Sequence, residues 1–472
     1  MKKLFKENDL VKVVIIAILF TAVLTWIVKG GSFAMNETGK IEFLASEDYI
    51  RTGINELTLS GVYAVSFFLQ QMAFVAVLGA FYGILSLTNG YKKLVKECAK
   101  FVKGKEIPVV LIVSALMALY VSISSQVYIS LLAVPFIISV LLNANLDKKT
   151  AFIATFGSIL VGILGATYGT EGLYFFNYYM GQDITKDVSI RFGILALAYV
   201  AFNFFNVLHM KKVLASKKTV DETKEDTFVV EEPTKKNTKV WPMITLLVIT
   251  FAFAVLGYVR WEEQFKFTKF AKFHKWLMEL KIGKKEIFAH LLGNVQPFGT
   301  WEIYSFFGVL LVISIVAAIV YKLSVDDFIK GAIDGVSKMV KPILLMILAY
   351  SVFVLIYWSP IVPKIVSDIL TSKFSVFDTA LSAMVSSFFT ADFGYAGYTI
   401  GQYLTSTYAT KMKEVIVIYS TMHGFVQTFA PTSVVLLLGL SYTKVSYKDW
   451  IAHIWKYLVT MLIALFIIFV AL

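Results

Sequence analysis

Apolar stretches about as long as a membrane-crossing helix alternate with short polar segments along most of the chain. An apolar helix of about 20 residues crosses a bilayer core of about 30 Å. The pattern predicts nine spans, at 10–28, 62–87, 151–179, 191–210, 241–258, 301–322, 338–358, 414–442 and 450–472. We expect the first to be retained as a helix, because its apolar run is long and Val28-Lys29-Gly30-Gly31 makes a poor signal-peptide cleavage site.

Two further apolar regions, 109–145 and 376–409, carry a polar patch in the middle, at 122–126 and 390–394. A polar turn at membrane depth must be buried in protein or line a cavity, because backbone groups facing lipid would lack hydrogen-bond partners. Lysines flank the first region on both sides, as expected if both of its ends are cytoplasmic. We therefore predict two re-entrant hairpins, with two tightly turned full spans as the alternative for the first.

Two of the predicted spans, 151–179 and 414–442, are too long for one straight crossing. A straight helix of 29 residues would be about 43 Å long. Each contains residues that disfavour a helix, in the run 165–172 of the first and in 424–433, with Pro431, of the second. Both segments are predicted to be broken helices.

The order of these elements repeats in the two halves of the chain: two spans, a polar-tipped hairpin, a long broken span and one more span. The single span at 241–258 would turn the second copy over. We predict an all-α polytopic membrane protein with about nine transmembrane helices and two re-entrant hairpins in an inverted repeat. Its parts are a first repeat (1–210), a cytoplasmic linker (211–240), a connecting span with an amphipathic outer segment (241–300) and a second repeat (301–472). Paired hairpins and broken helices of this kind mark a transporter site near the membrane midplane.

Composition agrees with a membrane protein, since 58% of the residues are hydrophobic, 16% are charged and the mean hydropathy is +0.73. Soluble domains average about 25% charged residues. The single cysteine, Cys98, excludes a disulfide scaffold and a cysteine-based metal cluster. The net charge of +12 resides in short lysine runs beside apolar stretches, which indicates an anionic bilayer surface and not nucleic acid. We expect a multi-pass protein of the cytoplasmic membrane.

Charge also predicts the orientation of the loops. Lysine-rich 88–107 and 211–240 suit the cytoplasm, acidic 29–61 suits the outside, and the C-terminus is expected outside. Residues 259–300 would lie outside in spite of their lysines. Their aromatic and leucine residues at helical intervals predict a basic amphipathic helix on the membrane surface. The mixed charges of 211–240, without an apolar period, predict a solvated tether between the halves, with a binding role as the alternative.

Candidate site residues lie at the two hairpin tips and the two breaks, where hydroxyls, amides and carboxylates accompany opened backbone. They are Ser122, Ser124, Ser125 and Gln126 at the first tip, Thr167, Thr170 and Glu171 at the first break, Asp392 and Gly394 at the second tip, and His423, Gln427, Pro431, Thr432 and Ser433 at the second break. A carboxylate inside a membrane is costly, so Asp392 and Glu171 are predicted to bind an ion or solute; helix capping is the alternative. The serines could instead bond their own helix, and His423 could be a packing residue. The three arginines are predicted at membrane interfaces, so no deep arginine clamp is expected.

The segment Gly424-Phe-Val-Gln-Thr-Phe-Ala-Pro-Thr-Ser433, followed by an apolar run and then Val445, Tyr447 and Trp450, resembles the YfcC family, relatives of the anaerobic C4-dicarboxylate carriers. The segments 79–106 and 326–340 are similar to that family's basic loop region and its cytoplasmic arm. The chain departs from the family pattern at His423 and Gln427. The resemblance implies the ion transporter superfamily fold, a homodimer, and secondary transport of organic anions or amino-acid-like solutes driven by sodium or protons.

Together these observations predict an ion-coupled secondary transporter, not an enzyme, for a small dicarboxylate, amino acid or short peptide, working by an elevator-type mechanism. No cofactor is expected, and no metal beyond a coupling Na⁺; H⁺ is the other candidate ion. An ion channel is the alternative, because carbonyl-lined breaks also form pores. A membrane-embedded transferase is less favoured, because Asp326-Asp327 lies in the predicted cytoplasmic arm. An ATP-driven pump is not favoured, because the sequence contains no Gly-Lys-Ser/Thr phosphate-binding loop.

Overall fold

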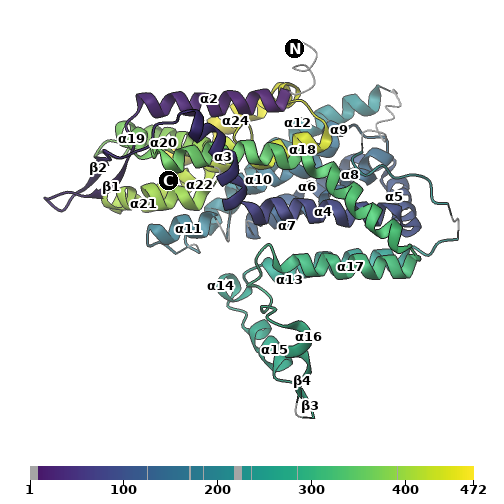
Figure 1. Cartoon of the computed structure of the whole chain (residues 1–472). Coiled ribbons are helices and arrows are strands. Elements are labelled where there is room, and N and C mark those ends of the chain that lie inside the picture. The colour runs from purple at the N-terminus through teal and green to yellow at the C-terminus, as the bar shows by residue number, and fades with distance from the viewer. Residues whose placement is uncertain are drawn as a thin grey trace.

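The computed structural model describes residues 9–124, 126–168, 172–183, 185–216, 226–234, 237–283, 285–390 and 392–472. These residues form a bundle of helices with two short β-hairpins at its periphery (Figure 1). The fold is therefore mainly α-helical, as predicted.

The first half of the chain contains a long first helix, a β-hairpin and a series of helices that ends in one long helix. Its elements are α2 (Asp9–Ile27), β1 (Gly31–Met35), β2 (Ile41–Ala45), α3 (Ile54–Phe67), α4 (Leu69–Leu87), α5 (Asn89–Val102), α6 (Glu106–Ser124), α7 (Val127–Ser130), η1 (Leu131–Ala133), α8 (Val134–Asn143), α9 (Lys148–Phe152), the π-helical η2 (Ile153–Gly157), α10 (Ser158–Leu164), α11 (Gly172–Tyr179) and α12 (Val188–Ala215). Strands β1 and β2 pair antiparallel, with Phe33 opposite Phe43.

A connecting helix, α13 (Trp241–Tyr258), leads to a projecting arm and then to the second half. The arm contains α14 (Trp261–Phe265), α15 (Lys269–Met278), β3 (Lys281–Ile282), β4 (Lys285–Glu286) and α16 (Ile287–Leu292). The second half contains α17 (Ser305–Tyr321), α18 (Val325–Trp358), α19 (Val362–Ile369), α20 (Val376–Phe389), α21 (Phe393–Thr407), η4 (Ala409–Lys411), α22 (Met412–Gln427), α23 (Val434–Thr443) and α24 (Tyr447–Ala471).

Seven helices of the described chain are long and apolar enough to cross a membrane, namely α2, α4, α6, α12, α13, α18 and α24. The predicted spans 151–179 and 414–442 are absent from this set because both are broken into shorter helices. Three further differences concern the predicted spans 62–87 and 301–322 and the first predicted hairpin. The predicted span 62–87 is divided at Phe68 into α3 and α4, and α17 is slightly shorter than a full crossing. Helix α6 has 19 residues, so the first arm of the predicted hairpin is long enough to cross alone.

Corresponding helices of the two halves pack antiparallel. Helices α4 and α18 meet through glycines at four-residue spacing, because a Cβ on Gly335 would lie 2.0 Å from the carbonyl oxygen of Gly79, and one on Gly83 would lie 2.1 Å from that of Gly331. Small residues let helix backbones approach this closely in membranes. Helices α12 and α24 are also antiparallel, since His453 near the start of α24 lies 3.1 Å from Asn206 near the end of α12. This arrangement is the one an inverted repeat requires.

The segment 376–409 folds back on itself. Helix α20 leads into the tip at Thr390, and α21 returns from Asp392. At the open end, the Tyr408 hydroxyl donates to the Thr371 carbonyl at 2.5 Å, so both ends of the hairpin lie together. With 14 residues, α20 is shorter than a bilayer crossing.

The segment 109–145 also turns back at its polar patch. Contacts along α12 show how this segment is oriented. Near the start of α12, Arg191 donates to the Thr167 carbonyl, beside the tip, and in the middle of α12 the Tyr199 hydroxyl donates to the Leu111 carbonyl. Near the end of α12, His209 forms a hydrogen bond with Asp147, which follows the second arm. The second arm is irregular, since α7, η1 and α8 follow one another. The polar patch therefore lies toward the start of α12 and both arms extend toward its other end.

Both long segments are broken where the sequence predicts. The first helix ends at Leu164 and resumes at Gly172 as α11; the second ends at Gln427 and resumes at Val434 as α23. Gly424, which was included in the predicted break, is still helical. A Cβ there would lie 2.2 Å from the Cα of Leu164, so this glycine permits the close crossing of α22 and α10.

The solvated tether predicted at 211–240 is wrong for its second half. Residues 217–225 lie outside the described chain, but Asp226, Phe228 and Val230 are buried against the bundle. Their apolar and hydrogen-bonding contacts, described below, outweigh the polar composition on which the prediction rested.

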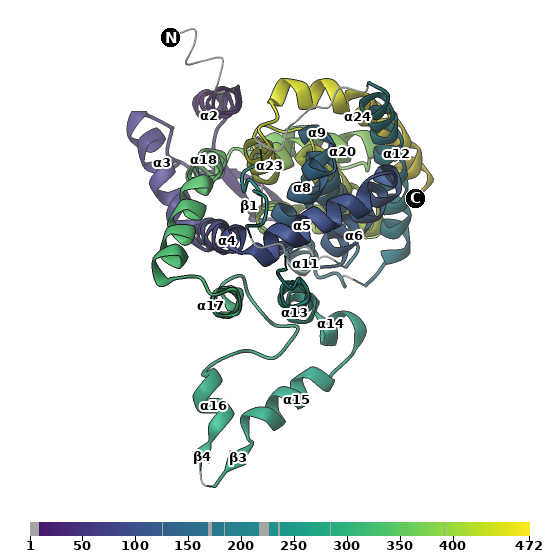
Figure 2. The same cartoon turned by 90° about the vertical axis from the view of Figure 1, so that its right-hand side faces the viewer.

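The arm between α13 and α17 projects away from the bundle (Figures 1 and 2). The amphipathic helix predicted there corresponds to α15, which has no buried residue. Phe273 and Trp276 are 48% and 58% exposed, whereas Phe270 packs on Trp261 with ring centroids 5.6 Å apart. A basic helix with exposed aromatic rings is suited to a membrane surface.

The loops predicted on opposite sides of the membrane lie at opposite ends of the molecule. The β1–β2 hairpin, α11 and α19 are at one end, and α5, α8 and α9 are at the other (Figure 1). We call the second the lysine-rich end, because it contains Lys92, Lys93, Lys96 and Lys100 of α5. By the positive-inside rule we expect this end to face the cytoplasm.

Cysteine accessibility tests this orientation. In a chain with Cys98 replaced by serine, we expect Thr38→Cys, at the exposed β1–β2 turn, to react with an impermeant maleimide in intact cells. Asn237→Cys, exposed at the lysine-rich end, should react only after permeabilisation. Reaction of Asn237→Cys from outside would contradict the predicted topology.

Candidate functional site

A cavity of about 500 Å³ lies where the two breaks and the two hairpin tips meet. The residues that line it come from both halves of the chain. They include Val121, Val127 and Tyr128 at the first tip, Ala166, Gly172 and Leu173 around the first break, Asp392 and Phe393 at the second tip, and Ser420, His423, Gln427 and Val434 around the second break. The sequence-based expectation that these four segments lie together agrees with this geometry.

The first break is closed by hydrogen bonds to the first hairpin. The Ser122 hydroxyl donates to the Gly165 carbonyl at 2.6 Å, and the Thr167 amide donates to the Ser122 carbonyl at 2.9 Å. The Thr167 hydroxyl bonds the same carbonyl at 3.1 Å. Gly165 and Thr167 follow the end of α10, where the regular helical hydrogen bonds stop, and Ser122 lies in the last turn of α6 beside them. Ser122 and Thr167 therefore satisfy opened backbone, and both side chains are fully buried.

Arg191 supports the same break from α12. Its Nε donates to the Thr167 carbonyl at 3.0 Å, and the residue is only 2% exposed. All three arginines are predicted at membrane interfaces, and the buried contact of Arg191 with the break was not anticipated. The prediction rested on how close each arginine lies to the end of an apolar run. The side chain of Arg191 is instead positioned by its hydrogen bond to the break that follows α10.

The second break is held by the second hairpin in the same manner. The Thr432 hydroxyl donates to the Phe388 carbonyl at 2.6 Å, and the Gln427 side-chain amide donates to the Ser387 carbonyl at 3.3 Å. Ser433 is the N-cap of α23, and its hydroxyl accepts a hydrogen bond from the Leu436 amide at 3.4 Å. Pro431 lies half-buried between them and supplies no amide hydrogen. Each hairpin is thus tied to the break of its own half.

Asp392 is both a helix cap and part of the cavity lining. Its Oδ1 accepts hydrogen bonds from the amides of Gly394 and Tyr395, at 2.8 and 3.2 Å, at the start of α21. The capping alternative in the sequence analysis is therefore observed. Within the described chain, the hydrogen bonds to the Asp392 carboxylate go to Oδ1, and the residue is exposed and lines the cavity. Gly394 itself is buried, and a Cβ there would lie 3.0 Å from Phe175.

Two buried polar atoms on the cavity wall lack a protein partner among the described residues, His423 Nδ1 and Gln71 Oε1. The His423 ring stacks on Phe393, with centroids 4.8 Å apart. Unsatisfied buried polar atoms are rare and call for a ligand or water. His423 lines the cavity and also packs on Phe393, so both roles considered for it in the sequence stay predictions.

Charged groups reach the cavity from segments other than the hairpins and the broken helices. Arg260 and Glu263 come from the junction of α13 and α14, and Glu302 precedes α17. Arg260 donates to the Gly299 carbonyl at 3.3 Å and so joins the two ends of the arm. Sequence reasoning missed all three, because their distance from the hairpins and breaks gives no signal. The only hint was that Arg260 and Glu263 border a predicted span.

Of the predicted site residues that the structure describes, Asp392, His423 and Gln427 line the cavity. The Ser124 hydroxyl donates to the Tyr120 carbonyl one helical turn earlier at 2.7 Å, which is the alternative that the sequence analysis left open for serine. Gln126 is buried and occupies the N-cap position of α7. Ser125, Thr170 and Glu171 lie outside the described residues, so their predicted roles stay predictions.

Comparison with known proteins gives a family and distant structural relatives. The family model of the DcuC C4-dicarboxylate anaerobic carriers matches residues 8–472. A search of curated proteins finds no match. Among solved structures, the YdaH transporter of Alcanivorax borkumensis is similar at 13% identity and a TM-score of 0.39, over 98% of each chain. MtrF of Neisseria gonorrhoeae, whose structure is described as illuminating a class of antimetabolite efflux pumps, is similar at 11% identity and a TM-score of 0.36, over 98% of this chain and 94% of MtrF.

The dual position of Asp392 allows its cap to be tested apart from its charge. Asp392→Ala removes the acceptor for two amides and should lower the free energy of unfolding by about 1 kcal/mol. Asp392→Asn keeps an acceptor oxygen and should stay close to the parent. Thermal unfolding in detergent measures both. Equal loss of stability in the two variants would mean that the charge, and not the cap, stabilises the fold.

Proposed function

The chain belongs to the DcuC family of C4-dicarboxylate anaerobic carriers, and from this premise we propose that it is an ion-coupled secondary transporter of an amino-acid-like solute. As a carrier of this family it is a multi-pass membrane protein and not an enzyme. The solute, the coupling ion and the mechanism form the proposal. The single observation that carries it is the cavity between the two breaks, with polar atoms that the protein itself leaves unpaired.

The charges around the cavity favour a solute with an amino group. Three carboxylates line the cavity, those of Glu263, Glu302 and Asp392, against a single arginine, Arg260. A dicarboxylate, the solute in the family's name, would meet more negative than positive charge. A solute with one carboxylate and one ammonium group balances this lining, since like charges in a poorly solvated site repel strongly. Among the solutes that the sequence left open, an amino acid or short peptide therefore fits best.

The solute's carboxylate also has a place in this arrangement. Helices α21 and α23 both begin at the cavity, with Phe393 and Val434 in its wall. The N-terminus of a helix carries a partial positive charge and free amides, which attract anions. Arg260 adds a full positive charge to the cavity lining. The ammonium group would then lie toward Glu263 and Glu302.

The coupling ion is proposed to bind next to Asp392. One of its oxygens caps α21, and the other remains available for Na⁺ or H⁺. The carbonyls of the second hairpin at Ser387 and Phe388 are occupied by Gln427 and Thr432, so they support the break and contribute less to an ion site. Sodium and proton coupling make opposite demands on the carboxyl group, because Na⁺ requires the ionised form.

We further propose that the hairpins, the broken helices, α12 and α24 move together against α2, α4 and α18, in an elevator-type mechanism and as a homodimer. The hydrogen bonds from each hairpin to its own break support one moving body. Helices α4 and α18, locked through their glycines, support a separate rigid scaffold. Between the two, the hydroxyls of Tyr128 and Tyr350 lie 2.5 Å apart across the cavity mouth.

A thermal-shift assay on the purified chain tests the solute class. Each α-amino acid is paired with the carboxylic acid of the same carbon skeleton, and succinate serves as the four-carbon dicarboxylate. We expect a solute with an amino group to raise the unfolding temperature by a few degrees at saturation, about the effect of mass action, and its partner acid to have little effect. Glu263→Gln combined with Glu302→Gln should reduce that preference, whereas Glu262→Gln, at an exposed neighbouring position, should not.

Stabilisation by succinate alone, unchanged in the double variant, would contradict an amino-acid-like solute. The same assay with and without sodium, repeated across pH and in Asp392→Asn, identifies the coupling ion. Loss of the sodium effect in Asp392→Asn would support sodium at this carboxylate.

Cross-linking tests the proposed moving body. Ser114 and Ser158 lie within it, with their hydroxyl oxygens 2.7 Å apart, whereas Met339 of α18 and Leu438 of α23 line one crevice between it and the scaffold. A disulfide in Ser114→Cys/Ser158→Cys should spare uptake into proteoliposomes. A cross-link in Met339→Cys/Leu438→Cys should abolish it, with recovery on reduction. Full uptake with the second cross-link in place would contradict relative movement of the two parts.

A further inference from the structure

Residues 226–234, here called the strap, lie at the lysine-rich end over the seam between two groups of helices. On one side of the seam are α4 and α18 of the proposed scaffold. Helix α5 borders both sides, since it follows α4 in the chain and its Tyr91 packs on Phe136 of α8. On the other side are η1, α8 and α23, which belong to the proposed moving body. The strap has contacts with both groups, so it must stretch or release if they move apart.

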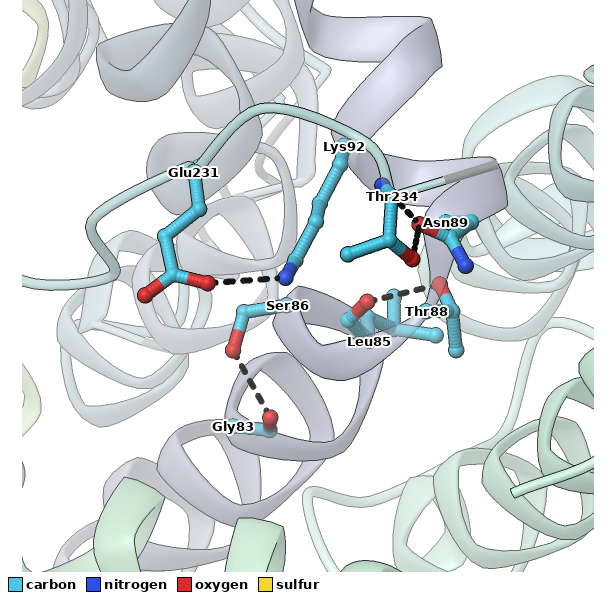
Figure 3. Close-up of polar contacts among 8 residues, drawn as sticks. All are labelled: Gly83, Leu85, Ser86, Thr88, Asn89, Lys92, Glu231 and Thr234. Carbon is cyan, nitrogen blue, oxygen red and sulfur yellow. Dashed lines mark hydrogen bonds and ion pairs between the residues drawn. The ribbon is translucent and has the colours of Figure 1, made fainter. Parts of the chain in front are cut away.

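At its C-terminal end the strap is held by polar contacts with α5, the helix that borders both groups (Figure 3). Glu231 forms an ion pair with Lys92 at 3.1 Å, and the amide and hydroxyl of Thr234 donate to Asn89 Oδ1 at 2.9 and 3.0 Å. Glu232 pairs with Lys96 at 2.8 Å. The side chains of Glu231 and Glu232 are 75% and 81% exposed. Ion pairs this exposed are weak and sensitive to salt, so this attachment can be released.

In the seam itself the strap inserts an aromatic ring. Phe228 is fully buried and lines a narrow crevice together with Gly79 and Met339 from the scaffold and Leu131 and Leu438 from the other side. Its ring lies 5.9 Å from Tyr82 of α4 and 6.4 Å from Tyr442 of α23, and Lys338 of α18 stands 5.0 Å above its face. One side chain thus fills space between elements of both groups.

On the moving side the strap is held by hydrogen bonds. The Thr227 hydroxyl donates to the Tyr442 carbonyl at 3.0 Å, and the Ser139 hydroxyl of α8 donates to Asp226 Oδ2 at 2.6 Å. The Phe228 amide donates to the other oxygen of Asp226 at 3.1 Å. Asp226 is 4% exposed. A buried carboxyl with only hydroxyl and amide partners is an unusual feature for a segment that was predicted to be solvated.

We propose that the strap is an autoinhibitory restraint, which docks across the seam at the lysine-rich end and must release before the moving body can travel. This inference rests on the proposed transport function, because it requires one group of helices to move past the other. Phe228 acts as a wedge in the crevice, and the charged contacts with α5 set how easily the wedge withdraws.

Acidity should control the docking through Asp226. The charged and titratable groups around it are Tyr91 of α5, Lys338 of α18, Tyr442 of α23 and Lys444 just after α23. Burial raises the pKa of Asp226 to about 7, and the two lysines oppose the rise only in part. A released strap would titrate near the ordinary value of about 4. Docking is therefore strongest at low pH, weakens as pH rises toward about 7 and is constant above it.

Labelling of single cysteines in the full chain, with Cys98 replaced by serine, tests the strap. Val230→Cys reports docking, because Val230 is 6% exposed, and Leu438→Cys reports opening of the crevice. Phe228→Ala should raise the labelling rate at both positions by about tenfold, the factor that corresponds to lost burial of an aromatic ring. It should also raise the initial rate of uptake without changing the half-saturating solute concentration. Val229→Ala, at a neighbouring position 45% exposed, should change neither.

Exchanging the charges of Lys92 and Glu231 distinguishes loss of strap docking from a general folding defect. Lys92→Glu should expose Val230→Cys, and adding Glu231→Lys should restore protection. Across pH, labelling of Val230→Cys relative to an exposed Val229→Cys reference should rise between about pH 5 and pH 7 in the parent. In Asp226→Asn, which cannot ionise, this relative rate should be flat.

Labelling of Val230→Cys that rises in Phe228→Ala while Leu438→Cys stays protected would overturn the proposal, since the strap would then release without opening the seam. Unchanged labelling at both positions would overturn it as well. If the unaltered chain transports none of the solutes, the proposed function fails, and the two labelling rates still decide whether the strap restrains the seam.

Discussion

Backbone groups opened inside a membrane protein must find hydrogen-bond partners within the protein, and this constraint shapes the whole centre of the molecule. The helix interrupted after Leu164 and the helix interrupted after Gln427 each expose carbonyls and amides. In each half, the hairpin next to the break supplies the partners: Ser122 in the first, and the carbonyls of Ser387 and Phe388 in the second. The breaks can exist only because the hairpins turn back beside them.

The same contacts explain why a cavity forms there. Once the opened backbone is satisfied from the hairpin side, the opposite side of each break is left free to face a common space. Among the described residues, His423 and Gln71 line that space and each has a buried polar atom without a protein partner, which supports the proposal that a solute binds there. Charge is added from the arm and the loop before α17, so the repeat builds the cavity while Arg260, Glu263 and Glu302 set its electrostatic character.

Features with a local physical cause could be predicted from the sequence. The breaks occur beside Gly165 and Pro431 because these residues cannot support a regular helix, and polar patches in apolar runs locate the hairpin tips. Features that depend on contacts distant in the chain could not. Nothing near Arg191 shows that its partner is the Thr167 carbonyl, and the glycines of α4 and α18 acquire meaning only when the two helices are side by side. The strap was misjudged for the same reason, because Asp226 and Phe228 look solvated until Ser139, Tyr82 and Tyr442 surround them.

The central claim is that the cavity between the two breaks binds the solute. Ser420→Cys places a thiol in its wall, at a position 4% exposed and next to His423 in the lining, while Cys98 lies away from the cavity as an internal reference. Mixed-disulfide formation with a small thiosulfonate, which releases a sulfinate, can be measured at both thiols while the concentration of a stabilising solute is raised. The account predicts that the solute slows reaction at Ser420→Cys over the concentration range in which it stabilises the protein, and leaves Cys98 unaffected. An unchanged rate at Ser420→Cys with saturating solute would place the solute elsewhere and contradict the account.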